Sequence, residues 1–91
     1  MNKAIRALLT TLLNQKKIGG SHTPEHRLIT AKTQWLNKEE RKEFEKEYKQ
    51  LKNEQILLCS RKRTGKGFDW HISLNPKRLK EVYEQLMEES S

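Results

Sequence analysis

Residues 56–74 read ILLCSRKRTGKGFDWHISL and predict two antiparallel strands joined by a tight turn. Gly65 and Lys66 are the expected turn residues, because glycine readily adopts the backbone conformation that such a turn needs at its first position. The register follows from this turn, and the predicted pairs are Thr64 with Gly67, Lys62 with Asp69, Arg61 with Trp70, Cys59 with Ile72, and Leu57 with Leu74. One face of the hairpin then becomes apolar, and we expect Cys59 and Trp70 to point inward from it.

Three helices are predicted ahead of this hairpin, and the first runs from about Asn2 to Lys17. Its apolar residues have the spacing of one helix face, and they are Ile5, Leu8, Leu9, Leu12 and Leu13. We expect Gly19 and Gly20 to end this helix in the left-handed conformation.

The second helix is predicted to be short and to end at about Thr33. Thr23, Pro24 and Glu25 form its start pattern, in which threonine caps free amides and proline suits the first helical position. Its expected inward residues are Leu28, Ile29 and Leu36, with Trp35 in or beside the turn that follows.

The third helix is predicted to run from a capping box at Asn37 and Glu40 to about Asn53. Its apolar stripe is narrow and consists of Phe44, Tyr48 and Leu51. The rest of its surface is highly charged.

A last helix is predicted after Asn75 and Pro76, over about 76–88. Its apolar stripe consists of Leu79, Val82, Tyr83, Leu86 and Met87. This stripe is too apolar to leave exposed, so we expect it to pack on the first helix or on a second subunit, the latter giving a homodimer. We expect one domain over 1–91, with a core over about 4–75.

The charge of the chain favours a polyanionic partner. The 91 residues include 19 Lys and Arg and 12 Asp and Glu, which give a net charge of +7. The excess lies in the first helix and in the hairpin. The single cysteine excludes an intramolecular disulfide, and without a signal segment or an eighteen-residue apolar run we expect a cytoplasmic protein with no membrane contact.

The third helix is divided lengthwise by charge when its residues are placed at steps of about 100°. One arc, called here the basic side, carries Lys38, Arg41, Lys42, Lys46, Lys49, Lys52 and Asn53, with Glu45 as its one acid. The opposite arc, called here the acidic flank, carries Glu40, Glu43, Glu47 and Glu54. A solvated helix laced with Glu–Lys pairs is the alternative interpretation.

The hairpin turn is also basic. Four bases surround it, namely Arg61, Lys62, Arg63 and Lys66. They suit contacts with phosphates or with a minor groove, although bases on a hairpin also prevent pairing between exposed edges.

No motif supports catalysis or metal binding. Residues 64–67, Thr-Gly-Lys-Gly, lack the upstream glycine and the hydroxyl residue of a phosphate-binding loop. His22 and His26 are separated by Pro24 and a helix start, and Cys59 has no second cysteine for a zinc site. We therefore expect no enzyme, no cofactor and no metal.

The order of three helices, a hairpin and a last helix resembles the winged helix-turn-helix family over about residues 4–75. Residues 19–25, GGSHTPE, and residues 73–76, SLNP, are similar to those of small, uncharacterised winged-helix proteins of archaeal type. The implied fold is mainly α with a small β-hairpin: three helices, a two-stranded wing and a C-terminal helix. The segment between the first two helices is short for the small strand that many family members carry there.

The resemblance implies nucleic-acid binding, and we expect a transcription regulator that binds double-stranded DNA. The third helix would enter the major groove through its basic side, and the hairpin would contact the backbone or the minor groove as a wing. The alternatives are a winged-helix module that docks a protein partner through the acidic flank or the last helix, and a binder of structured RNA.

Overall fold

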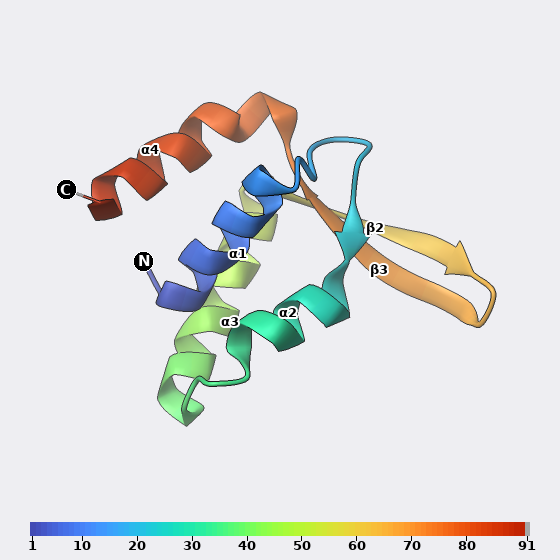
Figure 1. Ribbon diagram of the computed structural model, residues 1–91, viewed down its shortest axis with the longest axis horizontal. Helices are drawn as coiled ribbons and strands as arrows, with labels where there is room; N and C mark the ends of the chain where they lie inside the picture. The colour runs from blue at the N-terminus through green and yellow to red at the C-terminus, as the bar shows by residue number, and fades with distance from the viewer. Residues whose placement is uncertain (91) are drawn as a thin grey trace.

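The computed structural model describes residues 1–90, which form a mixed α/β domain with four α-helices and a three-stranded antiparallel sheet (Figure 1). In chain order the elements are α1 (Lys3–Asn14), β1 (Thr23–Pro24), α2 (Glu25–Thr33), α3 (Lys38–Asn53), β2 (Leu57–Thr64), β3 (Gly67–Leu74), the 3-10 turn η1 (Pro76–Arg78) and α4 (Leu79–Ser90). The predicted fold class, mainly α with a two-stranded hairpin, is corrected by the third strand.

The start of the second helix was predicted one residue too early, because Thr23 and Pro24, predicted as its cap and its first residue, form strand β1, and α2 begins at Glu25. Thr23 pairs with Ile72 and Pro24 pairs with His71, so β1 adds an edge strand to β3, and the strand order is β1-β3-β2. Proline fits this edge because it needs no partner for an N–H donor. A short segment between α1 and α2 does not preclude a strand, since two residues are enough to make this one.

Helix α1 ends three residues earlier than predicted, and Lys16 takes the left-handed position next to its end, with φ 55°. Gly19 is also left-handed, with φ 61°, but it lies beyond the helix end. The N–H of Lys17 donates to the carbonyl of Leu12 at 2.8 Å, which closes the helix end. Lys17 also accepts from the N–H of Leu74 at 2.8 Å, so pairing with β3 draws the chain out of the helix.

The predicted bounds of α3 and its capping box are confirmed. The Asn37 side chain accepts from the N–H of Glu40 at 2.8 Å, and the Glu40 side chain accepts from the N–H of Asn37 at 3.1 Å. The predicted stripe of Phe44, Tyr48 and Leu51 is buried.

The hairpin has the predicted register at every pair, but the prediction that Cys59 and Trp70 are buried on its apolar face was wrong. Trp70 is 55% exposed, Phe68 is 58% exposed, and Cys59 is also exposed. The hairpin projects beyond the helices (Figure 1), so only its base reaches the core, through Leu57, Ile72 and Leu74.

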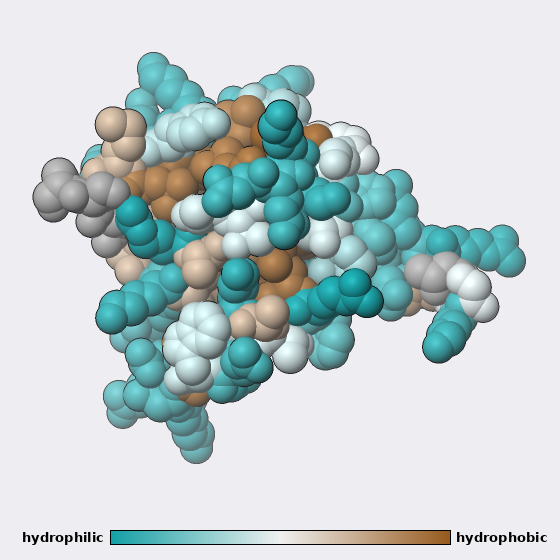
Figure 2. Space-filling view, in the orientation of Figure 1, coloured by the Kyte–Doolittle hydropathy of each residue, from teal (hydrophilic) through white to brown (hydrophobic). Residues whose placement is uncertain are grey.

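The core lies between α1, α3 and the base of the sheet, and it is closed by α4. Its main buried side chains are Ile5, Leu8, Leu9, Leu12, Phe44, Leu51, Ile56, Ile72, Leu74 and Val82. Leu79 and Leu86 pack against it, whereas Tyr83 and Met87 stay exposed. Figure 2 shows apolar surface gathered over α4 and α1. Within residues 1–90, no helix combines the length and the apolar content that a membrane crossing requires.

Candidate nucleic-acid interface

All seven residues of the basic side are exposed on α3. Two of them contact the protein itself: the Arg41 Nη2 atom donates to the carbonyl of Thr33 at 3.1 Å, and the Lys52 Nζ atom lies 4.8 Å from the centre of the Tyr48 ring. In the described part of the chain, no hydrogen bond or ion pair holds the ammonium groups of Lys38, Lys42, Lys46 and Lys49. Those four are therefore available to a polyanion.

The acidic flank of α3 is turned toward the start of α1. The Glu47 Oε2 atom accepts from the N–H of Asn2 at 3.1 Å, and the Asn2 side chain donates to the carbonyl of Glu40 at 3.3 Å. Lys46 also lines the shallow cleft beside Glu47, at the border of the two arcs. Lys42 and Lys49 thus lie nearer to the middle of the basic side.

The four bases of the hairpin are divided between its two faces and its turn. Arg61 and Arg63 share a face with Phe68 and Trp70, and the Arg61 guanidinium lies 4.5 Å from the centre of the Phe68 ring. Lys62 is on the opposite face, and Lys66 is in the turn. Arginine stacked on an aromatic ring keeps its charge while losing some of its freedom of movement.

The basic side and the hairpin meet at a cleft of about 270 Å³ lined by Glu25, Lys52, Cys59 and Trp70. Lys52 comes from the end of α3, and Trp70 comes from the face of the hairpin that bears Arg61 and Arg63. The structure therefore places the end of the basic side, at Lys52, beside the hairpin face that bears Arg61 and Arg63, a relationship that sequence spacing alone does not reveal.

Glu25, which also lines this cleft, contacts two side chains there. The Tyr48 hydroxyl donates to its Oε2 atom at 2.5 Å, and the Cys59 Sγ atom lies 3.9 Å from the same oxygen. Partial burial and the Glu25 carboxylate raise the pKa of the Cys59 thiol, and burial with the bond to Glu25 raises the pKa of Tyr48. A thiol with a raised pKa stays protonated near neutral pH, which makes it a poor nucleophile.

His22 and His71 form a pair that the sequence analysis missed. Their Nδ1 atoms are 2.7 Å apart, and their rings meet edge to face with centroids 4.7 Å apart. One ring must donate and the other accept, so at least one imidazole is neutral. The pairing of Pro24 with His71 brings the two histidines together, so a prediction of β1 from the sequence would have indicated this pair. Among the side chains that the structure describes, no three from His, Cys, Asp or Glu are placed to hold a metal ion.

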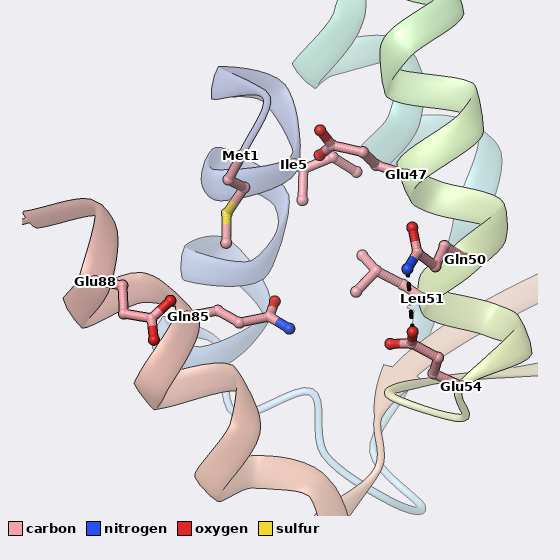
Figure 3. Close-up of a pocket in the computed structure, with 8 residues that line it drawn as sticks. All are labelled: Met1, Ile5, Glu47, Gln50, Leu51, Glu54, Gln85 and Glu88. Carbon is pink, nitrogen blue, oxygen red and sulfur yellow. Dashed lines mark hydrogen bonds between the residues drawn. The ribbon is translucent and has the colours of Figure 1, made fainter.

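A separate cleft of about 280 Å³ lies between α1, α3 and α4 (Figure 3). Ile5 and Leu51 form its apolar part, while Glu47 and Glu54 come from the acidic flank and Glu88 comes from α4. Its lining is acidic and apolar, in contrast to the basic side of α3.

Comparison of the chain with protein-family models, with curated proteins and with solved structures gives no match.

Proposed function

We propose that this chain is a winged-helix protein that binds double-stranded DNA, with α3 in the major groove and the hairpin as a wing on the adjacent backbone. The element order supports the fold, because the order is that of a winged helix, and β1 supplies the small strand found in many members of that family. Regulation of transcription is the use that we propose for such binding.

The observation that carries this proposal is the junction between the basic side and the hairpin. Lys52 and Trp70 line one cleft, and Arg61 and Arg63 share the hairpin face of Trp70. A DNA duplex lying along α3 could therefore place its phosphates near the lysines of α3 and the arginines of the hairpin at the same time. Phosphate contacts of this kind set the position of a protein on DNA.

Lysine dominates the basic side, and this bears on specificity. An ammonium group is a flexible point charge, whereas arginine, asparagine and glutamine can make two hydrogen bonds to one base edge. Asn53 is the one residue of the basic side with an amide that matches an adenine edge. We therefore propose binding in which phosphate contacts dominate and sequence preference is weak.

A salt titration tests the proposal. Fluorescence anisotropy with a labelled duplex should give a slope near −4 to −5 in log affinity against log salt concentration, the value for about five phosphate contacts. A slope near zero would contradict the proposal. Selection of bound sequences from a random DNA pool would then separate a specific regulator from a general binder.

A second candidate is a module that docks a protein partner, and the cleft between α1, α3 and α4 favours it. That cleft combines apolar side chains with three glutamates, which suits a basic amphipathic segment. Under this candidate, an acidic protein would not compete for the cleft, and substitutions at Glu47 and Glu54 would weaken partner binding without affecting DNA. Structured RNA is tested by competition between matched RNA and DNA duplexes. The predicted homodimer stays a prediction, tested by light scattering.

A further inference from the structure

A second cleft adjoins the junction, between the start of α2 and the part of β3 nearest the hairpin turn. It has a volume of about 460 Å³, and its lining includes Pro24, His26, Arg27, Phe68 and Trp70. This volume lies within the range of about 300–1,000 Å³ that is usual for small-molecule sites. The cleft is large enough for one planar heterocycle with its sugar.

The lining of this cleft combines aromatic surface with positive charge. Phe68 and Trp70 lie two residues apart on one face of β3, so both rings are presented on the same side, and each is more than half exposed. Arg61 covers one side of Phe68, and Arg27 lines the cleft from α2. Aromatic platforms flanked by cations are the combination that binds unpaired nucleotides, because rings stack on bases and cations neutralise phosphates.

Whether the flat face of a base is accessible distinguishes paired from unpaired nucleic acid at this cleft. In an uninterrupted duplex each base is stacked on its neighbours, so only its edges and the backbone are accessible. A ring inside a cleft can be used fully only by a base that has left the stack. A binding mode that involves only phosphates therefore makes no contact with the exposed rings of Phe68 and Trp70.

We propose that this cleft holds one unpaired nucleotide at the end of a duplex bound along α3, with the base against Trp70 and Phe68 and the phosphate near Arg61 and Arg27. The inference rests on the proposed function, because Lys52 of the basic side lies beside Trp70 and would guide the strand to the cleft. Glu25 and Asp69 also line the cleft. Their charge keeps phosphates out of its centre, and carboxylates accept from the amino groups of bases. The preferred substrate is thus duplex DNA with a single-stranded overhang.

Anisotropy titrations with matched DNAs test this inference. The probes are a blunt duplex and the same duplex with a short overhang at either the 3′ or the 5′ end. The proteins are the parent, Trp70→Ala, Trp70→Phe and the control Trp35→Ala, since Trp35 is 58% exposed in the turn before α3 and does not line the cleft. Circular dichroism checks that each variant is folded.

The parent should bind one overhang duplex at least about fivefold more tightly than the blunt duplex, the factor expected for one stacked base. Trp70→Ala should abolish this preference by lowering the affinity for the overhang duplex to that for the blunt duplex, while Trp70→Phe and Trp35→Ala should keep it. Equal affinity of the parent for blunt and overhang DNA would overturn the inference and leave the proposed function standing. An equal loss on both DNAs in Trp70→Ala would also overturn it, by making Trp70 part of the duplex contact. Failure of the parent to bind any of these DNAs would remove the proposed function as well.

Discussion

The Nδ1 atoms of His22 and His71 lie 2.7 Å apart and join the segment before β1 to the middle of β3. The contact requires one neutral ring, and the positive groups around it, Lys17 and Lys62, disfavour a second proton. Partial burial and these neighbours lower the pKa of His22. The attachment of β1 to β3 therefore depends on the protonation of His22 and His71.

Acidification should weaken this link. Because the pKa of His22 is lower in the folded chain than in the unfolded chain, the unfolded state binds more protons below the ordinary histidine pKa. The contribution to stability is fully present above about pH 6.5 and is lost as the pH falls through the lowered value. Urea unfolding followed by circular dichroism should give a lower midpoint at pH 5 than at pH 7.5. His22→Gln should reduce this difference, whereas the exposed His26→Gln should not change it.

The hydrogen bond between Tyr48 and Glu25 should contribute to stability, because it ties the buried stripe of α3 to the first residue of α2. Tyr48→Phe removes the donor and leaves the ring packed, so the free energy of unfolding should fall by about 1–3 kcal/mol. A change near zero in urea unfolding would mean that water replaces the tyrosine without cost. Arg41→Lys provides a separate probe of the α2–α3 contact, through the bond to Thr33.

Gln55 should be replaceable by glycine with a gain in stability. It has φ 61° where α3 ends, and the N–H of Ile56 donates to the carbonyl of Leu51 at 2.9 Å across it. A side chain in this left-handed conformation costs roughly 1–2 kcal/mol. Glycine removes this cost, although its larger entropy in the unfolded chain cancels part of the gain. Gln55→Gly should raise the unfolding midpoint, and Gln55→Ala should not, since alanine keeps the Cβ atom.

Local chemistry made some elements predictable from the sequence. The Asn37 and Glu40 capping box marked the start of α3, and the glycine turn with its alternating side chains determined the register of the hairpin at every pair. These features depend on residues close together in the chain, so spacing is enough to find them.

Other features depend on residues that are distant in sequence. Strand β1 exists because β3 offers an edge to Thr23 and Pro24, and α1 stops early because Lys17 pairs with Leu74. Trp70 shares its face of β3 with the buried Ile72 and Leu74, but it stays exposed because the hairpin extends beyond the helices, which alternation cannot reveal. For the candidate site, the sequence predicted the basic side of α3 but not its junction with Trp70 or the pairing of His22 with His71.

If the basic side of α3 binds the phosphates of a duplex, reversing the charge at the middle of that side should weaken DNA binding. Lys42→Glu with Lys49→Glu changes two exposed residues away from the buried stripe, so folding should be unaffected. The control is Lys77→Glu with Lys80→Glu, two exposed residues at η1 and the start of α4, which brings the net charge to the same value.

The measurement is duplex affinity by anisotropy across a range of salt concentrations, with circular dichroism of both variants. The α3 variant should lose most of its affinity, and its salt slope should flatten by about 1.8, or about 0.9 for each lost phosphate contact. The control should keep the parent slope, with at most a small loss from its reduced net charge. If the folded α3 variant binds the duplex as tightly as the control and with the same slope, α3 is not the element that contacts DNA.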